Sequence, residues 1–371
     1  MSRINKLIIA GILALGMQAA MVRAEDLANN PCAGNADDKT RSSTPPAAPR
    51  IGGYNVYYGQ LHGHTSISDG SGAPSDAYKY ARDTAKLDFF SIADHDYYPD
   101  DMTASDWTAI TNAANTYNSD GTFVTFWGFE WTSDDPSYGS GLLNKGHITI
   151  INSPDYCNAR YEPTRTLHQL CTWLSTRDAI AFFNHPGQYD TTFDKFVFNH
   201  TDNIVGMELW NRDTDYYSND GYYGNDGGLG YDDEALSRGW YVGASGSGDN
   251  HAKDWGTQNE WRMAVLAPRK TRASIYDAMK ARRFYSSRDK NLALSFTCNG
   301  AQMGSRIAGG ALNIEIEATD ADNETFSRID LLKNGAVVQR WTTNATHPMV
   351  TSTQSGHQGD YFYVRMYQSS T

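Results

Sequence analysis

LHGHTSISDG, residues 61–70, is the stretch around which the rest of the chain is organised. It places His62 and His64 two positions apart and follows them with a carboxylate, Asp69. If residues 54–61 form a β-strand, both imidazoles lie on one side of its end, because side chains on the same face repeat every two residues along a strand. Two such imidazoles can bind one metal ion. A His-x-His pair alone is common, however, so the pattern needs further ligands from elsewhere in the chain.

The first 24 residues have the layout of a secretory signal peptide. Arg3 and Lys6 give a positive start, residues 7–15 are apolar, and Ala24 is a small residue at the expected cleavage point. We therefore expect residues 1–24 to be removed and the protein to be periplasmic or secreted. Residues 25–50 are polar and contain several prolines, which is typical of a linker. No later stretch is long and apolar enough to span a membrane, so no membrane partner is expected after cleavage.

The charge of the chain bears on its partners. The formal net charge is −12, and loss of the three positive charges in residues 1–24 takes it to about −15. An acidic protein repels polyanions at long range, so the composition disfavours nucleic-acid binding. The net charge does not exclude a small anionic substrate, because bound metal ions can make the electrostatic potential at the site positive. The sequence leaves the oligomeric state open.

Four cysteines allow disulfide bonds in an exported protein. Cys157 with Cys171 would close a short loop, and Cys32 with Cys298 would tie the N-terminal segment to the later part of the chain. Free buried thiols are the alternative. The chain contains no C-x-x-C pair, so the cysteines do not resemble a zinc knuckle.

Strand and helix patterns alternate from residue 54 onward, which indicates an α/β fold of parallel strands with helices outside. We expect one domain over residues 51–290 and assign its elements from apolar periodicity and capping residues. The expected strands are 87–93, 122–131, 147–152, 179–183, 204–210 and 240–245, and the expected helices are 75–86, 105–117, 164–176 and 271–283.

Residues 291–371 have a different character. Apolar residues alternate in period two over 292–296, 312–317, 329–332 and 361–366, and Asn334-Gly335 is a hairpin turn signal. These features predict a small all-β, sandwich-like domain. It contains no catalytic cluster, so we expect it to serve packing or positioning.

Residues 212–234 form a long segment rich in Gly, Asn, Asp and Tyr. It follows a predicted strand, so it is interpreted either as a lid or substrate rim or as a surface insertion.

Polar residues that can bind metal follow several of the apolar strands. In barrels of parallel strands, the carboxyl ends of the strands carry the chemistry. His147 does not fit this rule, because it opens its strand. Nine residues are candidate metal ligands, and six of them are histidines out of the ten in the chain. They are His62, His64, Asp69, His95, Glu130, His147, His185, Asp249 and His251.

The order of these motifs resembles the PHP superfamily, named for polymerase and histidinol phosphatase domains, and covers residues 54 to about 285. His-x-His, the later Asp94-His95, the lone Glu130 and His147, the His185-Pro186 pair and the final Asp-x-His appear in the family's order. The resemblance implies a distorted seven-stranded (β/α) barrel. It also implies metal-dependent phosphoester hydrolysis with two or three divalent ions.

The resemblance further implies how the ligands are shared. One ion takes His62, His64, Glu130 and Asp249, and a second shares Glu130 and takes His147 and His185. A third takes Asp69, His95 and His251. Some family members have histidine where this chain has Asp69, which leaves the identity of the third ion open. Nitrogen and oxygen ligands without thiolate suit Zn, Mn or Fe.

The expected chemistry follows from these ligands. Metal ions that share a carboxylate can activate water and clamp the attacking and leaving oxygens, so no protein nucleophile is required. We assign catalytic roles to Glu130, Asp249 and His251. Lys145 and Arg212 are candidates for binding a phosphoryl oxygen. Asp94, Asp96 and Asn250 stand beside ligands and either orient imidazoles or serve the fold.

The sequence therefore predicts an exported metal-dependent hydrolase of small phosphate esters, with diesters preferred over monoesters. The chain also resembles the carbaryl-hydrolase-like branch of the superfamily, so hydrolysis of carbamates or carboxyl esters at the same site is an alternative. A non-catalytic metal- or ligand-binding module is a second alternative.

Overall fold

The structure is a computed structural model that describes residues 7–15, 48–133, 145–187, 192–197, 201–212 and 230–369. The rest of the expected signal peptide, most of the linker with Cys32, and residues 213–229 of the Tyr-rich segment lie outside the described residues.

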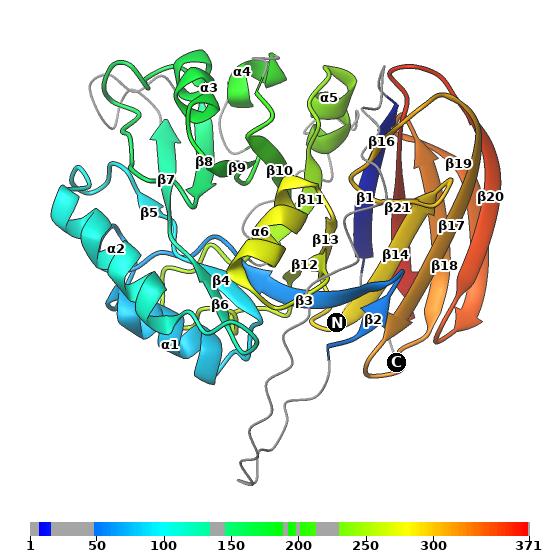
Figure 1. Ribbon diagram of the computed structural model, residues 1–371, viewed down its shortest axis with the longest axis horizontal. Coiled ribbons are helices and arrows are strands. Elements are labelled where there is room, and N and C mark those ends of the chain that lie inside the picture. Colours follow the sequence, from blue (N-terminus) through cyan, green and yellow to red (C-terminus); the bar gives the residue numbers. More distant parts are fainter. Residues whose placement is uncertain are drawn as a thin grey trace, which may run out of the picture.

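The chain forms a mixed α/β fold with six helices and many short strands in the described part (Figure 1). The helices are α1 (Pro74–Asp83), α2 (Ala104–Tyr117), α3 (Leu167–Ser175), α4 (Thr192–Phe196), α5 (Tyr231–Ser237) and α6 (Arg272–Lys280). The first thirteen strands are β1 (Leu7–Leu15), β2 (Arg50–Ile51), β3 (Tyr54–Gln60), β4 (Phe89–Ser91), β5 (Asp94–His95), β6 (Val124–Phe126), β7 (Gly128–Ser133), β8 (Gly146–Ile151), β9 (Ile180–Phe183), β10 (Ile204–Asn211), β11 (Gly243–Ser247), β12 (Arg262–Ala267) and β13 (Phe284–Ser287). The remaining strands are β14 (Leu292–Cys298), β15 (Ala301–Gln302), β16 (Arg306–Ile307), β17 (Gly310–Asp320), β18 (Phe326–Lys333), β19 (Ala336–Ala345), β20 (Met349–Gly356) and β21 (Tyr361–Gln368).

Three sheets organise these strands. An eleven-stranded sheet has the path β19-β18-β21-β1-β13-β12-β3-β4-β6, with β16 paired to β1 and β2 paired to β3 off this path. A six-stranded sheet has the order β11-β10-β9-β8-β7-β5, and a four-stranded sheet has the order β15-β14-β17-β20. Strands β3, β4 and β6 pair in parallel, as do β9, β10 and β11. The exact (β/α)7 barrel implied by the family resemblance stays a prediction.

The expectation of parallel strands throughout is wrong at β8. This strand pairs antiparallel with β7 on one side and with β9 on the other. Its first residues therefore lie beside the last residues of β7, with Thr132 opposite His147. The reversed direction explains why His147 opens its strand and still lies at the same sheet edge as ligands that end theirs.

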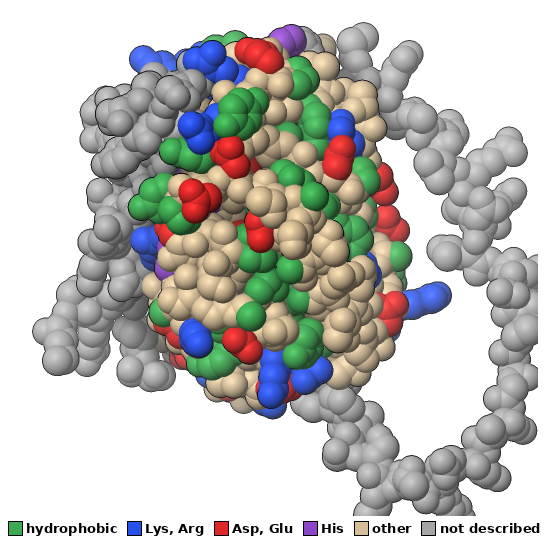
Figure 2. All heavy atoms as spheres, turned by 90° about the vertical axis from the view of Figure 1, so that its left-hand side faces the viewer, with side chains coloured by type: hydrophobic (Ala, Val, Ile, Leu, Met, Phe, Trp, Pro, Cys, Tyr) green, Lys and Arg blue, Asp and Glu red, His purple; other side chains and the backbone are tan. Residues whose placement is uncertain are grey.

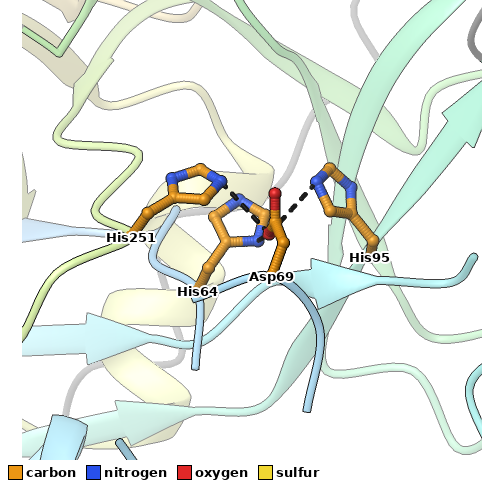
Figure 3. A group of neighbouring side chains, drawn as sticks. All are labelled: His64, Asp69, His95 and His251. Carbon is orange, nitrogen blue, oxygen red and sulfur yellow. Dashed lines mark ion pairs between the residues drawn. The ribbon is translucent and has the colours of Figure 1, made fainter. Parts of the chain in front are cut away.

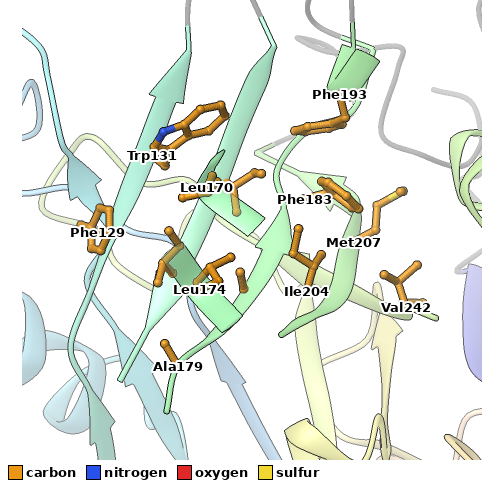
Figure 4. Close-up of a cluster of buried hydrophobic side chains, with 14 of the residues drawn as sticks. Phe129, Trp131, Leu170, Leu174, Ala179, Phe183, Phe193, Ile204, Met207 and Val242 are labelled. Carbon is orange, nitrogen blue, oxygen red and sulfur yellow. The ribbon is translucent and has the colours of Figure 1, made fainter. Parts of the chain in front are cut away.

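Helix α3 shows how apolar spacing fixes the packing around this sheet. Thr166 caps the helix by accepting a hydrogen bond from the amide of Gln169, whose side chain bonds back to Thr166. The buried face carries Leu167, Leu170, Cys171 and Leu174, as the sequence predicts. Leu170 and Leu174 lie among Phe129 and Trp131 of β7 in one apolar cluster (Figure 4).

The C-terminal strands confirm the expected period-two pattern. Strand β17 alternates buried and exposed residues, and its buried side chains share a core with those of β14, β18 and β21. The Asn334-Gly335 pair joins β18 to β19 with both residues at positive φ, as a two-residue hairpin turn requires. The boundary at residue 291 stays a prediction. Within the eleven-stranded sheet, β1 pairs with β13, which precedes this boundary, and with β21, which follows it.

The disulfide that the sequence allows between Cys157 and Cys171 does not form, and the alternative of free buried thiols holds. Both residues are buried free thiols, as is Cys298. Burial raises the pKa of the Cys171 thiol to about 12, so this side chain serves as a small apolar core residue. Cys32 lies outside the described residues.

The surface over α1 and α2 carries mixed charge. Figure 2 shows Lys and Arg side chains on this face scattered among acidic ones. Within the described ranges, no helix is long and apolar enough to cross a membrane.

Strand β1 overlaps the predicted signal peptide. Residues Leu7–Leu15 pair antiparallel with β13 and with β21, so β1 is the strand that joins these two in the eleven-stranded sheet. Removal of residues 1–24 would leave β13 and β21 without their common neighbour.

The N-terminus of exported protein tests the signal-peptide prediction. We expect N-terminal sequencing of the extracytoplasmic fraction to begin at Glu25. Exported protein that retains residues 7–15 would contradict cleavage and support a permanent role for β1.

Helix α5 is held against β21 by a buried carboxylate. Asp233 accepts hydrogen bonds from the hydroxyls of Tyr361 and Tyr363, at 3.1 and 2.8 Å. Its neighbour Asp232 is buried too, and its Oδ1 has no hydrogen-bond partner among the described residues. Burial and the adjacent Asp233 charge raise the pKa of Asp232 to about 8.

Replacement Asp232→Asn should therefore stabilise the protein in a pH-dependent way. The Asp232 carboxyl ionises near pH 4 in the unfolded chain but only near pH 8 in the folded chain. As the pH rises from 4 to 8, ionisation therefore stabilises the unfolded state and lowers the free energy of unfolding. We expect no gain at pH 4 and a gain of about 1–2 kcal/mol at pH 8, measured by urea unfolding. The exposed Asp100→Asn is the control, and an Asp232→Asn gain independent of pH would contradict the raised pKa.

Candidate metal centre

Sheet edges and adjoining loops bring the candidate ligands together. His62 and His64 follow β3, His95 ends β5, Glu130 lies on β7 and His147 on β8. His185 follows β9, and Asp249 and His251 follow β11. All nine predicted ligands meet at this place, and seven of them are buried; Asp69 and His251 are the more exposed pair, each with 27% of the side chain accessible.

The backbone of the 61–70 loop is joined to the segment after β11. The amide of His64 donates to the carbonyl of Asn250 at 2.8 Å, and the amide of Asp249 donates to the carbonyl of His62 at 3.0 Å. A side chain at Gly63 would meet the ring of Phe90 at 2.9 Å. The two ligand-bearing segments are therefore fixed to each other before any metal binds.

Asp94 closes the loop on its other side. It accepts hydrogen bonds from the amide and hydroxyl of Thr65, at 2.7 and 2.6 Å, and from the hydroxyl of Ser68 at 2.6 Å. Ser68 in turn lies 3.3 Å from His64 Nδ1. Asp94 thus positions His64 through the loop rather than by touching its ring.

The suggestion that Asp94, Asp96 and Asn250 orient imidazoles directly is not what the contacts show. Asp96 accepts from the amides of Thr132 and Ala159. The Asn250 amide donates to Asp254 and Gln258. These side chains serve the fold around the ligands, which was the alternative interpretation.

Glu208 is a buried carboxylate that orients the His62 imidazole, and the sequence reasoning missed it. Its Oε1 lies 2.9 Å from His62 Nδ1, while its Oε2 accepts from the amide of His185 at 2.9 Å. The carboxylate is 3% exposed. The available signal was a single acid inside the otherwise apolar strand Ile204–Asn211, a position that needs a partner to be tolerated.

Glu130 lies at the centre of the ligands. His62 Nε2 is 3.2 Å from its Oε1, His95 Nδ1 is 2.9 Å from its Oε2, and His147 Nδ1 is 3.2 Å from its Oε1. His185 Nε2 lies 3.4 Å from Oε1, and His64 Nε2 lies 3.6 Å from Oε2. One buried carboxylate is therefore in contact range of five imidazoles.

Asp69 is the carboxylate around which a second group of imidazoles lies, on the more exposed side of the metal centre (Figure 3). Its Oδ1 lies 3.2 Å from His251 Nε2 and 3.7 Å from both His95 Nε2 and His64 Nδ1. Figure 3 shows the three imidazoles around this carboxylate.

Three sets of donor atoms are close enough to hold an ion each. They are His62, His64 and Asp249; His95, Glu130 and His147; and His64, Asp69, His95 and His251. The first and third agree in outline with the sets implied by the family resemblance, with His64 added to the third. In the second, His95 stands in the position expected for His185, so the exact assignment of ligands to ions stays a prediction.

The two candidates for phosphoryl binding have different surroundings. The ammonium of Lys145 forms an ion pair with Asp194 of α4. The Arg212 guanidinium lies at the site, with Nε 3.0 Å from Asp249 Oδ2 and an η nitrogen 2.9 Å from His251 Nδ1. Of the two, Arg212 is placed to meet an anion at the metal centre.

The electrostatics of the site favour cations. Burial alone would raise the pKa of Glu130, but His62, His147 and His95 outweigh it and hold the pKa well below its ordinary value. Burial and the neighbouring His95 lower the pKa of His64 to about 3. His64 is therefore neutral at physiological pH, which is the form of histidine that binds metal.

The donor atoms fit divalent metal ions. His62 Nε2 and His64 Nε2 face each other at 3.1 Å. The Glu208 contact favours a proton on His62 Nδ1, which leaves the Nε2 lone pair directed at Glu130, His64 and Asp249. Burial alone would lower the pKa of His62, but Asp249, Glu130 and Glu208 outweigh it and raise the pKa, so this position attracts positive charge, which a metal ion would supply.

Comparisons with known proteins give distant matches. A family model described as "Protein of unknown function (DUF3604)" matches residues 83–140. An uncharacterized protein from Chlamydia muridarum is 22% identical over 304 residues, which covers 76% of this chain and 48% of the relative. Another from Chlamydia pneumoniae is 22% identical over 305 residues, with the same coverage. The chain thus spans about half the length of the curated relatives it matches.

Among solved structures, a two-domain protein from Bacteroides vulgatus is described as containing a predicted PHP-like metal-dependent phosphoesterase. It is 16% identical, with a TM-score of 0.47, and the match covers 90% of this chain and 92% of that chain.

Glu208 can be tested as a positioning residue. Glu208→Gln keeps the size of the side chain but removes the charge that favours the His62 tautomer. We expect metal affinity to fall about 10–100-fold, measured by competition with a chromophoric chelator. Glu234→Gln, on the exposed side of α5, is the control. Unchanged affinity in Glu208→Gln would show that the contact does not tune the ligand.

Proposed function

We propose that this chain is a metal-dependent hydrolase of small phosphate esters, with diesters preferred over monoesters. The observation that carries the proposal is the convergence of nine nitrogen- and oxygen-bearing side chains on the buried Glu130 and the adjacent Asp69. The absence of thiolates from these sets supports Zn, Mn or Fe ions, two or three in number. The sequence pattern supports a (β/α)7 PHP barrel as the scaffold and export to the periplasm or beyond the cell.

The ions would be held by the three sets of donors, in which His64 and His95 each belong to two neighbouring sets. When bound, such ions lower the pKa of water and neutralise charge on phosphoryl oxygens. The chain's own groups prepare this chemistry. Glu208 favours the His62 tautomer, Asp94 fixes the loop that carries His64, and burial keeps bulk water away from Glu130.

Arg212 supplies the recognition of an anionic substrate. Its guanidinium is partly exposed beside Asp249 and His251, at the open side of the centre. A planar guanidinium donates two parallel hydrogen bonds to a phosphate, which a single ammonium does not. We assign no such role to Lys145, because its ammonium pairs with Asp194 of α4, whereas the partners of Arg212 are candidate metal ligands.

Substrate class is tested by a panel of aryl phosphodiesters, aryl phosphomonoesters and aryl carbamates, assayed with Zn, Mn or Fe. We expect the diester to be hydrolysed fastest. Carbamate turnover without phosphoester turnover would replace the proposal with the carbamate-hydrolase alternative. Metal binding without turnover of any ester would favour a binding module.

Site variants test the metal centre itself. His62→Ala and Asp249→Ala should each lower hydrolysis by at least about 100-fold and reduce metal content, because they remove ligands of one set. His357→Ala, whose side chain is 81% exposed in the β domain, is the control. Full metal content and hydrolysis in both site variants would disprove the site.

The split between the donor sets gives a sharper test. Asp69→Ala should remove one ion and leave the others, whereas the double variant His62→Ala with His64→Ala should disrupt the ions around Glu130. Metal stoichiometry by mass spectrometry distinguishes the two. Equal loss in both variants would mean that the sets are not separable.

A further inference from the structure

Asn184 is a buried amide side chain that contacts the central carboxylate of the metal centre. It follows β9, immediately precedes His185, and is 1% exposed. Its Nδ2 donates a hydrogen bond to Glu130 Oε1 at 2.5 Å. A hydrogen bond to an ionised carboxylate is stronger than one between neutral groups. Asn184 is therefore a strong partner of Glu130 that does not belong to the nine candidate ligands.

The orientation of the Asn184 carboxamide is fixed by β8. The amide of Thr149 donates to Asn184 Oδ1 at 3.2 Å, which turns the oxygen away from Glu130 and the nitrogen toward it. The same nitrogen also donates to Thr149 Oγ1 at 3.0 Å. The backbone amide of Asn184 donates to the carbonyl of His147 at 3.0 Å and so holds the residue beside that strand. These contacts select the carboxamide orientation that presents a donor to the carboxylate.

The two oxygens of Glu130 face different imidazoles. Oε1, which accepts from Asn184, lies 3.2 Å from His62 Nε2 and 3.2 Å from His147 Nδ1. Oε2 lies 2.9 Å from His95 Nδ1. A carboxylate with one oxygen bound to a fixed donor cannot turn about its last side-chain bond without breaking that hydrogen bond. The Asn184 contact therefore fixes which imidazoles each oxygen of Glu130 faces.

Little space is available for water to replace this donor. Glu130 is 0% exposed. Asn184, Thr149 and Glu208 line a cavity behind the centre with a volume of about 10 Å³. A cavity of that size holds about one water molecule. The hydrogen bond to Glu130 therefore comes from the chain itself rather than from bulk water.

We propose that Asn184 is a positioning residue that holds Glu130 between the imidazoles on its two sides. By binding Oε1, it keeps Oε2 turned toward His95. The amide nitrogen has no free lone pair for a metal ion, so Asn184 acts through Glu130 and is not assigned as a ligand. This inference rests on the metal centre of the proposed function, because the position of Glu130 matters only if the carboxylate binds ions.

The donor sets differ in their dependence on Glu130, which makes the role testable. One set contains this carboxylate together with His95 and His147. Another set contains no atom of it and consists of His64, Asp69, His95 and His251. Loss of the Asn184 donor should therefore weaken binding of the ion beside Glu130 and spare the ion beside Asp69. A general loss of folding would weaken both.

Replacement Asn184→Leu tests the proposal, because it removes the donor, keeps about the same side-chain volume and gives water no extra room. We expect the ion beside Glu130 to bind about 10–100-fold more weakly in Zn titrations of the full-length chain, measured by competition with a chromophoric chelator. Asn184→Ala leaves room for a water molecule to donate instead, so it should show a smaller loss at the same ion. Mass spectrometry should show that the ion beside Asp69 is retained in both variants.

Combination with Asp69→Ala identifies the affected ion. Asn184→Leu and Asp69→Ala should each remove one ion at limiting Zn, and the double variant should remove two. The matched control is Asn203→Ala, which loses hydrogen bonds to the carbonyls of Arg177 and Ala179 and should bind Zn as the wild type does.

Three outcomes would overturn the role of Asn184. Wild-type affinity for every ion in Asn184→Leu would remove this role and leave the metal centre in place. Equal weakening of all ions would mean that Asn184 serves only the fold. Absence of Zn binding by the wild-type chain would instead overturn the metal centre of the proposed function, and the positioning role with it.

Discussion

The contact between the buried Glu130 carboxylate and the imidazoles around it is the constraint on which the site depends. A carboxylate removed from water is costly unless positive charge or hydrogen-bond donors surround it. Here the surrounding groups come from β3, β5, β8 and β9, so electrostatic balance at one residue requires several chain segments to meet. Asp94 and Asp96, which lie beside the ligands, accept hydrogen bonds from backbone amides and so fix the segments that carry the ligands. The fold therefore presents the ligands in a fixed arrangement, which is the condition for tight binding of metal ions.

Much of this arrangement could be predicted from the sequence, because the ligands occur in short motifs beside apolar strands. That reasoning predicts a common location for His62, His64, His95, Glu130, His185 and Asp249, and the structure brings these six side chains together, although His62 and His64 follow a strand of a different sheet. His147 does not follow the strand-end rule, since the direction of β8 is set by pairing with β7 and β9 rather than by local residues. The sequence does not identify the role of Glu208. An acidic residue in a buried strand has the same appearance in sequence whether it contacts a metal ligand, as Glu208 does, or a group that only stabilises the fold.

The errors elsewhere have physical causes of the same kind. Cys157 and Cys171 are close in sequence, but sequence separation says nothing of the geometry that a disulfide needs. Lys145 and Arg212 were equal candidates until their partners were known. The β domain was easier, because period-two alternation and the Asn334-Gly335 turn are local signals. The role of residues 7–15 is still an expectation, since the same apolar run suits a signal peptide and a strand.

The antiparallel pairing of β7 and β8 has a consequence for how such a site can vary among relatives. The register that sets Thr132 opposite His147 is fixed by the ladder, so both strands keep their ligands in place whatever length of chain connects them. Closing a longer loop costs little, about 0.6 kcal/mol for each doubling of length. Insertions between residues 133 and 146 would therefore leave Glu130 and His147 in their places in the ladder.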